Sequence, residues 1–320
     1  MRILAVIALL AAACGGTQTF KDQSRDALPS KDTVSMGSPK SSSATSRPGA
    51  SSIEQDSTAG QHSPFFDLTA GVAVIFNGGT AGLLGIVENV TDQEPTSCDA
   101  TSCTWGPGSS ALDYNTFKIV VSKDGSDFDW SLSAEKKSAP GSGFVTFMSG
   151  KATPGPQRHH GSGSFSIDFD KAATLDGPHD ATGKMEVTSY SNVGPAHLDV
   201  VFTGVKDDQH LGQKQNIVYS YANDATGGGD LDFAVHSTSS GDRFKVHSRW
   251  KNGGQGRADV AGVGTGYDVS LAECWGAAPF GVTYFSSSLK AVIFPFAGPD
   301  AGDQAQCAYP TASPSAKTAP

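Results

Sequence analysis

The sequence predicts a mainly β protein: a single curved antiparallel meander sheet or partial barrel of about ten strands, with N-terminal helices packed on one face. Three observations lead to this fold class. Apolar and polar residues alternate with period two from residue 105 onward, and clusters of Gly, Asn, Asp and Ser separate most of these runs. No helix-length segment lies between the runs, and parallel strands need such crossovers, so the strands are expected to be antiparallel. A two-sheet β-sandwich is the alternative.

The composition is that of an ordinary globular protein with an acidic balance. Of 320 residues, 38% are hydrophobic and 38 are Gly, so the apolar share is close to half and wholesale disorder is excluded. The net charge of −9 argues against a nucleic-acid partner and against a polybasic membrane patch. We expect a single β-rich domain over residues 65–310, because all-β domains often reach this size.

The first residues predict export. Met1-Arg2 gives a cationic start, and residues 3–13 form an apolar run that is too short to span a bilayer but typical of a signal peptide. The stretch Leu10-Ala11-Ala12-Ala13-Cys14 resembles the lipobox of bacterial lipoprotein precursors, with Ala11 where the family usually has Leu. The resemblance implies a cleaved signal peptide over residues 1–13 and a lipid on Cys14. A signal peptide cut elsewhere, with Cys14 discarded, is the alternative.

The residue after the cysteine bears on location. An Asp at that place retains lipoproteins in the inner membrane in the well-studied sorting system, whereas this chain has Gly15. The resemblance therefore implies an anchor in the outer membrane, on its periplasmic or surface face. Several acyl chains on Cys14 make such anchoring effectively permanent.

Both ends of the mature chain are expected to be disordered. Residues 14–64 are interpreted as the lipidated cysteine and a tether, because residues 15–64 contain 12 Ser and 5 Thr and few large apolar side chains. Such a segment buries too little surface to offset the entropy lost on ordering. Residues 311–320, rich in Ala, Pro, Ser and Thr, are interpreted as a disordered tail.

The domain is expected to begin with helix. Between Phe65 and about Val90 apolar residues recur at steps of three and four, which predicts two helical pieces broken at Asn77-Gly78-Gly79. Pieces this short and interrupted do not span a membrane. They are expected to pack an apolar stripe onto the sheet.

The strands follow with clear turn chemistry. Phe117, Ile119 and Val121 alternate with polar residues, then Lys123-Asp124-Gly125 intervenes, and a second alternating run follows. Asp-Gly between two such runs is the strongest short-range indication of a hairpin. The acidic, Gly-rich stretch Asn223–Asp230 is interpreted as another, longer hairpin turn.

The cysteines suggest an oxidising compartment. With Cys14 assigned to lipid, four cysteines remain, an even number in an exported chain, with three possible connectivities. Proximity favours Cys98–Cys103, which leaves Cys274–Cys307. A zinc site of four cysteines is the competing interpretation, and the lack of a Cys-x-x-Cys motif argues against it.

Candidate chemistry is sparse. His236, His247 and Arg249 occupy polar-face positions of neighbouring predicted strands, and Asp259 lies on the next, so a polar cluster forms there if the register permits. Ordinary cross-strand ion pairing is the alternative.

Two other groups of polar residues receive simpler interpretations. His159 and His160 are adjacent, so on an extended segment they point to opposite faces and do not chelate one metal ion. Asp168 and Asp170 are expected to share the outer face of a strand, where catalysis by paired carboxylates is disfavoured. We expect neither a metal nor another cofactor, because the chain has no P-loop, H-E-x-x-H motif, G-x-S-x-G elbow or dinucleotide fingerprint.

Several scattered stretches resemble uncharacterised secreted lipoproteins of myxobacterial type. They are Trp105-Gly106-Pro107, Ser248-Arg249-Trp250, residues 256–260, and Glu273-Cys274-Trp275 followed by Cys307-Ala308. The resemblance covers most of residues 65–310 and implies one domain with the late disulfide. It implies no activity and no site residues.

These observations lead to three hypotheses of function. The first is a membrane-anchored lipoprotein whose β domain binds a partner or has a structural role without catalysis. The second is a carrier of an apolar ligand or lipid between helix and curved sheet, which rests on likeness of architecture alone. The third is a hydrolase that uses His and Asp residues on the polar face of the sheet.

Overall fold

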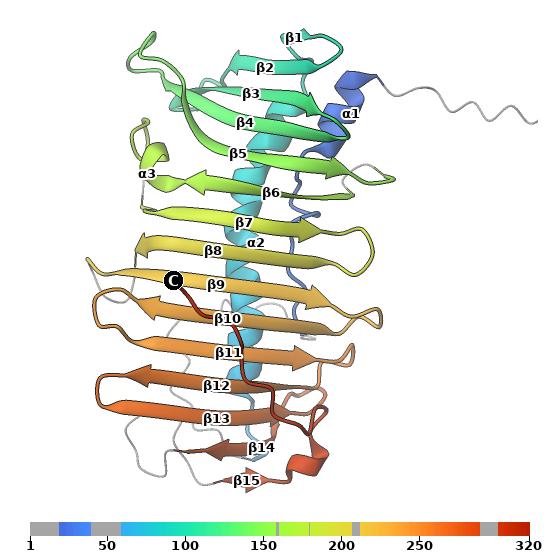
Figure 1. Cartoon of the computed structure of the whole chain (residues 1–320), viewed down its shortest axis with the longest axis vertical. Helices are drawn as coiled ribbons and strands as arrows, with labels where there is room; N and C mark the ends of the chain where they lie inside the picture. Colours follow the sequence, from blue (N-terminus) through green and yellow to red (C-terminus); the bar gives the residue numbers. More distant parts are fainter. Residues whose placement is uncertain (1–18, 40–58, 158–159, 179, 207–211, 289–299) are drawn as a thin grey trace, which may run out of the picture.

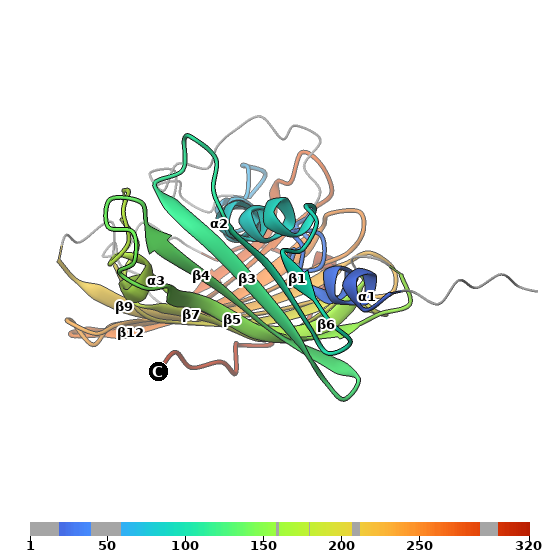
Figure 2. The same ribbon diagram turned by 90° about the horizontal axis from the view of Figure 1, so that it is seen from above.

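The computed structural model describes residues 19–39, 59–157, 160–178, 180–206, 212–288 and 300–320. These residues form one open antiparallel sheet in which fifteen strands lie side by side in chain order. A long helix crosses one face of the sheet, the inner face, and the C-terminal segment lies on the opposite, outer face (Figures 1 and 2). The predicted mainly β fold with a single curved sheet is confirmed, and the sandwich alternative is wrong.

Each strand pairs antiparallel with the strands before and after it. The strands are β1 Ser97–Cys98, β2 Ser102–Gly108, β3 Asn115–Asp124, β4 Asp127–Lys136, β5 Val145–Pro154, β6 Gly161–Asp168, β7 Lys184–Ser191, β8 His197–Lys206, β9 Lys214–Asn223, β10 Gly229–Ser237, β11 Arg243–Trp250, β12 Gly256–Gly264, β13 Tyr267–Trp275, β14 Val282–Ser287 and β15 Ala301–Gly302. The helices are α1 Phe20–Ala27, α2 Pro64–Thr91, α3 Phe169–Ala172 and the 3-10 turn η1 Gln304–Gln306.

The sheet has more strands than the sequence predicted, and the missed strands lie at its ends. The edge strands β1 and β15 have two residues each, too few for a period-two pattern. Short edges also limit the unpaired backbone that another chain could join. The predicted turns are confirmed: Gly125 adopts a positive φ of 64° between β3 and β4, and the Asp224 side chain accepts hydrogen bonds from Thr226 N and Gly228 N between β9 and β10.

Helix α2 is continuous through the stretch where the sequence predicted a break. Gly78 and Gly79 are in regular helix, with open space where their side chains would be. Two glycines cost about 1 kcal/mol each relative to Ala. That cost is offset by packing on either side of them, because Phe76 and Leu84 are buried. Asn77 also binds the main chain of Met36, with 2.8 Å hydrogen bonds to its N–H and its carbonyl.

Residues 19–39 are ordered, so the prediction of a disordered tether is wrong for this part of residues 14–64. Helix α1 is capped by Thr19, whose side chain accepts a hydrogen bond from Asp22 N. The segment that follows α1 uses its few large apolar side chains for packing, since Leu28, Val34 and Met36 are all buried. Residues 40–58 and Cys14, with the predicted signal peptide, lie outside the described residues.

The core lies between α2 and the inner face of the sheet. Its largest side chains are at most 1% exposed and come from both ends of the sheet: Phe65, Leu84, Trp105, Ile119, Trp275 and Phe285. The α2 helix runs across the strands along the long axis of the sheet (Figure 1). The expected packing of an apolar helical stripe on the sheet is therefore present.

The first turn of α2 is fixed to β13 by a buried carboxylate. Ser63 caps the helix by accepting a hydrogen bond from Phe66 N at 2.9 Å, and its hydroxyl donates to Glu273 Oε1. Phe65 N donates to the same oxygen at 3.3 Å, and Glu273 is fully buried. The charged end of Glu273 thus interacts with the positive end of the helix.

Replacing Ser63 with alanine is expected to lower the free energy of unfolding by about 2 kcal/mol. The variant loses a helix cap and one donor to a buried carboxylate, each worth about 1 kcal/mol. Urea denaturation of both proteins measures the difference. The matched control is Ser126→Ala in the exposed β3–β4 turn, which should change stability by less than about 0.5 kcal/mol. Equal effects of the two variants would contradict this assignment.

His62, just before α2, should make stability depend on pH. Burial lowers the pKa of His62, but hydrogen bonds to Asp67 at 2.9 Å and to the Pro279 carbonyl at 3.0 Å outweigh burial and leave it raised from its ordinary value of 6.5. Because the pKa is raised in the folded state, protonated His62 stabilises the fold. This contribution is fully present below pH 6.5 and is lost as pH rises through the folded pKa. Urea denaturation at pH 5.5 and 8.5 should therefore show a smaller drop in stability for His62→Gln than for the wild type. An identical drop in both proteins argues against this contribution.

Candidate functional site

A cluster of polar side chains occupies the outer face of β10, β11 and β12. The register places Asp232 opposite His247 and Asp230 opposite Arg249 across β10 and β11. Across β11 and β12 it places His247 opposite Asp259, and Arg249 opposite Arg257. We call this set the outer-face cluster: Asp230, Asp232, His247, Arg249, Arg257 and Asp259.

Three of the four polar residues predicted from sequence belong to this cluster. His247, Arg249 and Asp259 lie together, as the period-two pattern suggested. His236 also lies on the outer face but apart from them, opposite Arg243 at the far end of β10. The sequence prediction missed Arg257, although its spacing of two from Asp259 puts both on one face of β12.

Asp259 is the centre of the cluster. Its carboxylate accepts hydrogen bonds from Arg257 Nε and Nη2 at 2.9 and 2.7 Å, and from Arg249 Nη2 at 3.2 Å. The main-chain N–H of Ser313 adds a further bond at 3.0 Å. Arg257 is 1% exposed and Asp259 is 4% exposed. Charges this deeply buried are tolerated because they are paired and their hydrogen bonds are satisfied.

His247 connects the cluster to the end of the chain. Its Nε2 lies 2.9 Å from Asp230 Oδ1, and its Nδ1 donates to the carbonyl of Ser313. Burial lowers the pKa of His247, but these two hydrogen bonds outweigh burial and leave the pKa raised. The imidazole is thus held by an acceptor on each side.

The C-terminal segment, residues 308–320, lies on this outer face, so the prediction of a disordered tail over residues 311–320 is wrong. It starts at the disulfide between Cys307 and Cys274 of β13 and extends across β12, β11 and β10 to β9 (Figure 1). Figure 2 shows its end on the side of the sheet opposite to α2. The outer-face cluster donates to carbonyls of this segment: Arg257 to Tyr309 and Pro310, Arg249 to Thr311, and His247 to Ser313. Nearby side chains outside the cluster donate to its last carbonyls: Arg243 to Ala319, and His236 and Asn216 to Pro320.

The other face of the sheet carries an apolar surface beside α2. Phe202, Tyr219, Phe233 and Phe244 form a row across β8 to β11, with ring centroids 5.8 to 6.0 Å apart. On α2, Val74 and Ile75 are 55% and 70% exposed. Among the described residues, α2 is the one helix long and apolar enough to cross a membrane, a length and composition that core helices of soluble proteins also have. We call the aromatic row with Val74 and Ile75 the inner apolar surface.

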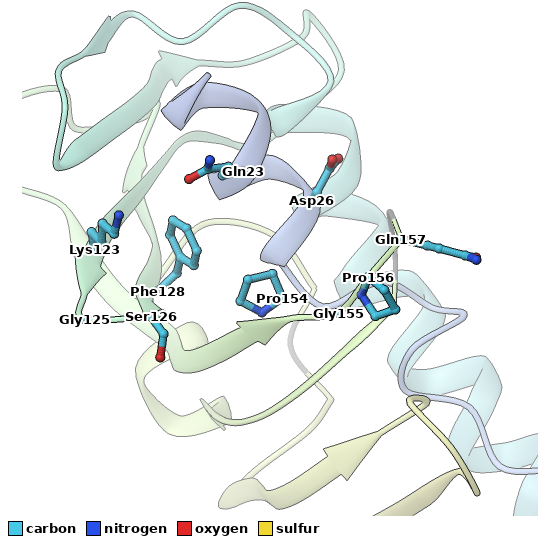
Figure 3. Close-up of a pocket in the computed structure, with 10 residues that line it drawn as sticks. All are labelled: Gln23, Asp26, Lys123, Gly125, Ser126, Phe128, Pro154, Gly155, Pro156 and Gln157. Carbon is cyan, nitrogen blue, oxygen red and sulfur yellow. The ribbon is translucent and has the colours of Figure 1, made fainter. Parts of the chain in front are cut away.

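A depression lies at the other end of the sheet from the outer-face cluster. It has a volume of about 300 Å³ and lies between α1 and the turn that joins β3 to β4. Figure 3 shows Gln23 and Asp26 on α1, with Phe128 and Pro154 of the sheet beside them. Its lining mixes glycine, proline and polar residues, and no histidine or cysteine is among the ten lining residues. The geometry therefore gives no reason to place catalysis there.

The remaining sequence candidates have structural roles or fall outside the described residues. Asp168 and Asp170 do not share a strand: Asp168 ends β6 and caps α3, whereas Asp170 lies in α3 and accepts a hydrogen bond from Gly183 N at 2.9 Å. The prediction that both residues share a strand face is wrong because β6 ends at Asp168 and helix α3 begins at the next residue. His159 lies outside the described residues. Both predicted disulfides, Cys98–Cys103 and Cys274–Cys307, are present, so the alternative zinc site of four cysteines is wrong.

Comparison with known proteins gives no family. No protein-family model, no curated protein and no solved structure significantly matches this chain.

Proposed function

We propose that this protein is an exported lipoprotein, anchored in the outer membrane through Cys14, whose β domain binds an extended polypeptide without catalysis. The observation that supports peptide binding is the contact between the outer-face cluster and residues 309–320. Arg249 and Arg257 donate to main-chain carbonyls, and Asp259 accepts a main-chain N–H. Such contacts do not depend on the side chains of the bound segment. The face is therefore suited to any extended segment, and its own tail is the resident one.

The composition of the tail supports this role. Proline fixes φ near the extended region and has no N–H, so a Pro-containing segment is pre-extended and presents carbonyls that need donors. Residues 309–320 contain three prolines, Pro310, Pro314 and Pro320. The donors to the first carbonyls of this segment are Arg249, Arg257 and His247, which Asp259 and Asp230 hold in place. Because this donor set is preorganised, binding loses little side-chain entropy.

A labelled peptide tests the binding role. A synthetic peptide of residues 309–320 carrying fluorescein should bind a chain that ends at Ala308, and should bind the full chain at least about tenfold more weakly because the resident tail competes. Fluorescence anisotropy measures both affinities. Arg249→Ala in the shortened chain should weaken binding, whereas Lys123→Ala, at the end of β3, should not. A folded shortened chain that fails to bind the peptide would refute the proposal.

The anchor needs its own test. Cys14→Ser should release the protein from the membrane fraction and change its mobility, because the acyl chains that hold it there can no longer be attached. Globomycin treatment should change the mobility of the wild type in the same direction. If Cys14→Ser remains in the membrane fraction, the proposal of a lipid anchor is wrong.

A second candidate function is a carrier of an apolar ligand, and the inner apolar surface is the observation that favours it. Val74 and Ile75 of α2 are exposed to solvent, and three rings of the aromatic row, Phe202, Tyr219 and Phe244, are only partly buried. Exposed apolar patches of this kind often bind ligands or membranes. Native mass spectrometry of the purified protein should then detect copurifying lipid, and less of it for Ile75→Asp. Protein that carries no lipid after gentle purification would argue against the carrier.

A further inference from the structure

We propose that Asp230, Asp232 and His247 form a binding site for one divalent transition metal ion, with Zn²⁺ as the best-matched ion. The three residues each offer one ligand atom, and these atoms all lie within 4.8 Å of one another. Asp230 and Asp232 share the outer face of β10, and Asp232 lies directly opposite His247 on β11. One imidazole nitrogen and two carboxylate oxygens are ligands that zinc accepts.

A buried oxygen in this group has no partner. Asp232 Oδ1 is shielded from solvent and makes no hydrogen bond with the described residues. Most buried polar atoms have a partner, and one that lacks it calls for an explanation such as a missing ion. The guanidinium groups of Arg249 and Arg257 bind Asp259 and leave this oxygen without a hydrogen bond. A metal ion between Asp230 and Asp232 gives Asp232 Oδ1 the partner that it lacks.

His247 is oriented as a metal ligand usually is. Histidines that bind metals commonly donate the second ring N–H to a carbonyl or carboxylate, which fixes the tautomer and the ring orientation. Here Nδ1 donates to the Ser313 carbonyl of the tail, and Nε2 faces Asp230 and Asp232. In the metal-bound state the ion replaces the proton on Nε2.

The spacing of the ligand atoms fits an ion of this size. Zinc lies about 2.0 to 2.2 Å from nitrogen and oxygen ligands in a tetrahedron, which places neighbouring ligand atoms about 3.3 Å apart. His247 Nε2 and Asp230 Oδ1 are 2.9 Å apart, so a small separation of the two admits the ion. His247 is 9% exposed and Asp230 is 51% exposed at the side chain, which gives the ion a route from solvent along Asp230. Three protein ligands leave the fourth position to water.

The site is distinct from the peptide-binding role, but the two share the Ser313 carbonyl. A metal ion on Nε2 strengthens the hold of His247 on that carbonyl, and by linkage the docked tail strengthens metal binding. The site can nevertheless be tested alone, because zinc affinity is measured on the full chain without any peptide.

The key variant is Asp232→Asn, compared with Asp129→Asn. Asp232→Asn keeps the shape of the side chain and removes the negative charge of a carboxylate whose Oδ1 has no hydrogen-bond partner among the described residues. Asp129 lies on β4, where it pairs with Lys151 at 3.6 Å at the other end of the sheet, and serves as the matched control. Isothermal titration of the untagged full chain with Zn²⁺ alone should give one site in the wild type and in Asp129→Asn. Asp232→Asn should bind Zn²⁺ at least about tenfold more weakly.

Thermal denaturation separates loss of the site from loss of the fold. Zinc should raise the melting temperature of the wild type and of Asp129→Asn but not that of Asp232→Asn. Without metal, Asp232→Asn should keep a stability close to that of the wild type, because the side chain keeps its shape and its Oδ1 has no hydrogen bond to lose among the described residues. Wild-type protein that does not bind zinc, or zinc binding that is unchanged in Asp232→Asn, would overturn the proposal.

Discussion

Replacing Arg257 with methionine is expected to lower the free energy of unfolding by about 3 kcal/mol, because it leaves the buried carboxylate of Asp259 without its main partner. Arg257 contributes both Nε and Nη2 to Asp259, whereas Arg249 contributes a single longer bond of 3.2 Å. Methionine fills much of the volume, so the loss reflects the unpaired charge more than a cavity. Urea denaturation of the wild type and the variant measures it.

A double variant and a surface control make this prediction specific. Removing the charge as well, in Arg257→Met with Asp259→Leu, should recover part of the lost stability, because replacing both partners of a buried ion pair is often neutral. Arg243→Met removes a bond to the Ala319 carbonyl at a partly exposed site and should cost less than about 1 kcal/mol. If the double variant is no more stable than Arg257→Met, the argument from the unpaired charge fails.

The second large effect is expected for the disulfide that starts the tail. Replacing Cys274 and Cys307 together with alanine should lower the free energy of unfolding by about 3 to 4 kcal/mol in the chain-entropy model, because the bond closes a loop with a sequence separation of 33. Urea denaturation without reductant measures this. The same variant should allow chymotrypsin to cut after Tyr309 more rapidly, because residue 307, just before the tail, is no longer bonded to β13.

The other disulfide is the matched control. Cys98 and Cys103 close a loop with a sequence separation of only 5, so replacing both should cost about 2 kcal/mol in the same model. These residues lie in β1 and β2, at the opposite end of the sheet from the tail, so the rate of cleavage after Tyr309 should not change. If both pairs accelerate this cleavage equally, the late disulfide has no special role in holding the tail.

The sheet could be predicted from the sequence because the patterns that indicate its strands and turns each lie within a short stretch of residues. Strands such as β3 and β4 alternate apolar and polar residues and are joined by Asp-Gly, so period and turn both appear within about twenty residues. Helix α2 was predicted in two pieces because helix propensity penalises Gly78 and Gly79. Its continuity depends instead on packing against the sheet and on the contact between Asn77 and Met36, which are distant in sequence.

The tail and the full candidate site could not be predicted in the same way. The composition of residues 311–320 is that of a disordered segment, and the side chains that order it, such as His247 and Arg249, lie more than sixty residues away. His247, Arg249 and Asp259 were found because strand alternation fixes which face a residue occupies. Asp232 was missed because its closeness to His247 depends on the register between β10 and β11, which the sequence alone leaves open.

The order of the strands also has a consequence for how the chain folds. Because every strand pairs only with its neighbours in sequence, no pairing within the sheet has to wait for a distant part of the chain. Short sequence separations between contacting residues favour rapid folding. A chain that emerges N-terminus first can therefore add one hairpin at a time to a growing edge. Residues 308–320 follow all fifteen strands in the sequence and cover β9 to β12 only when those strands are in place, so the docked tail marks a completed sheet.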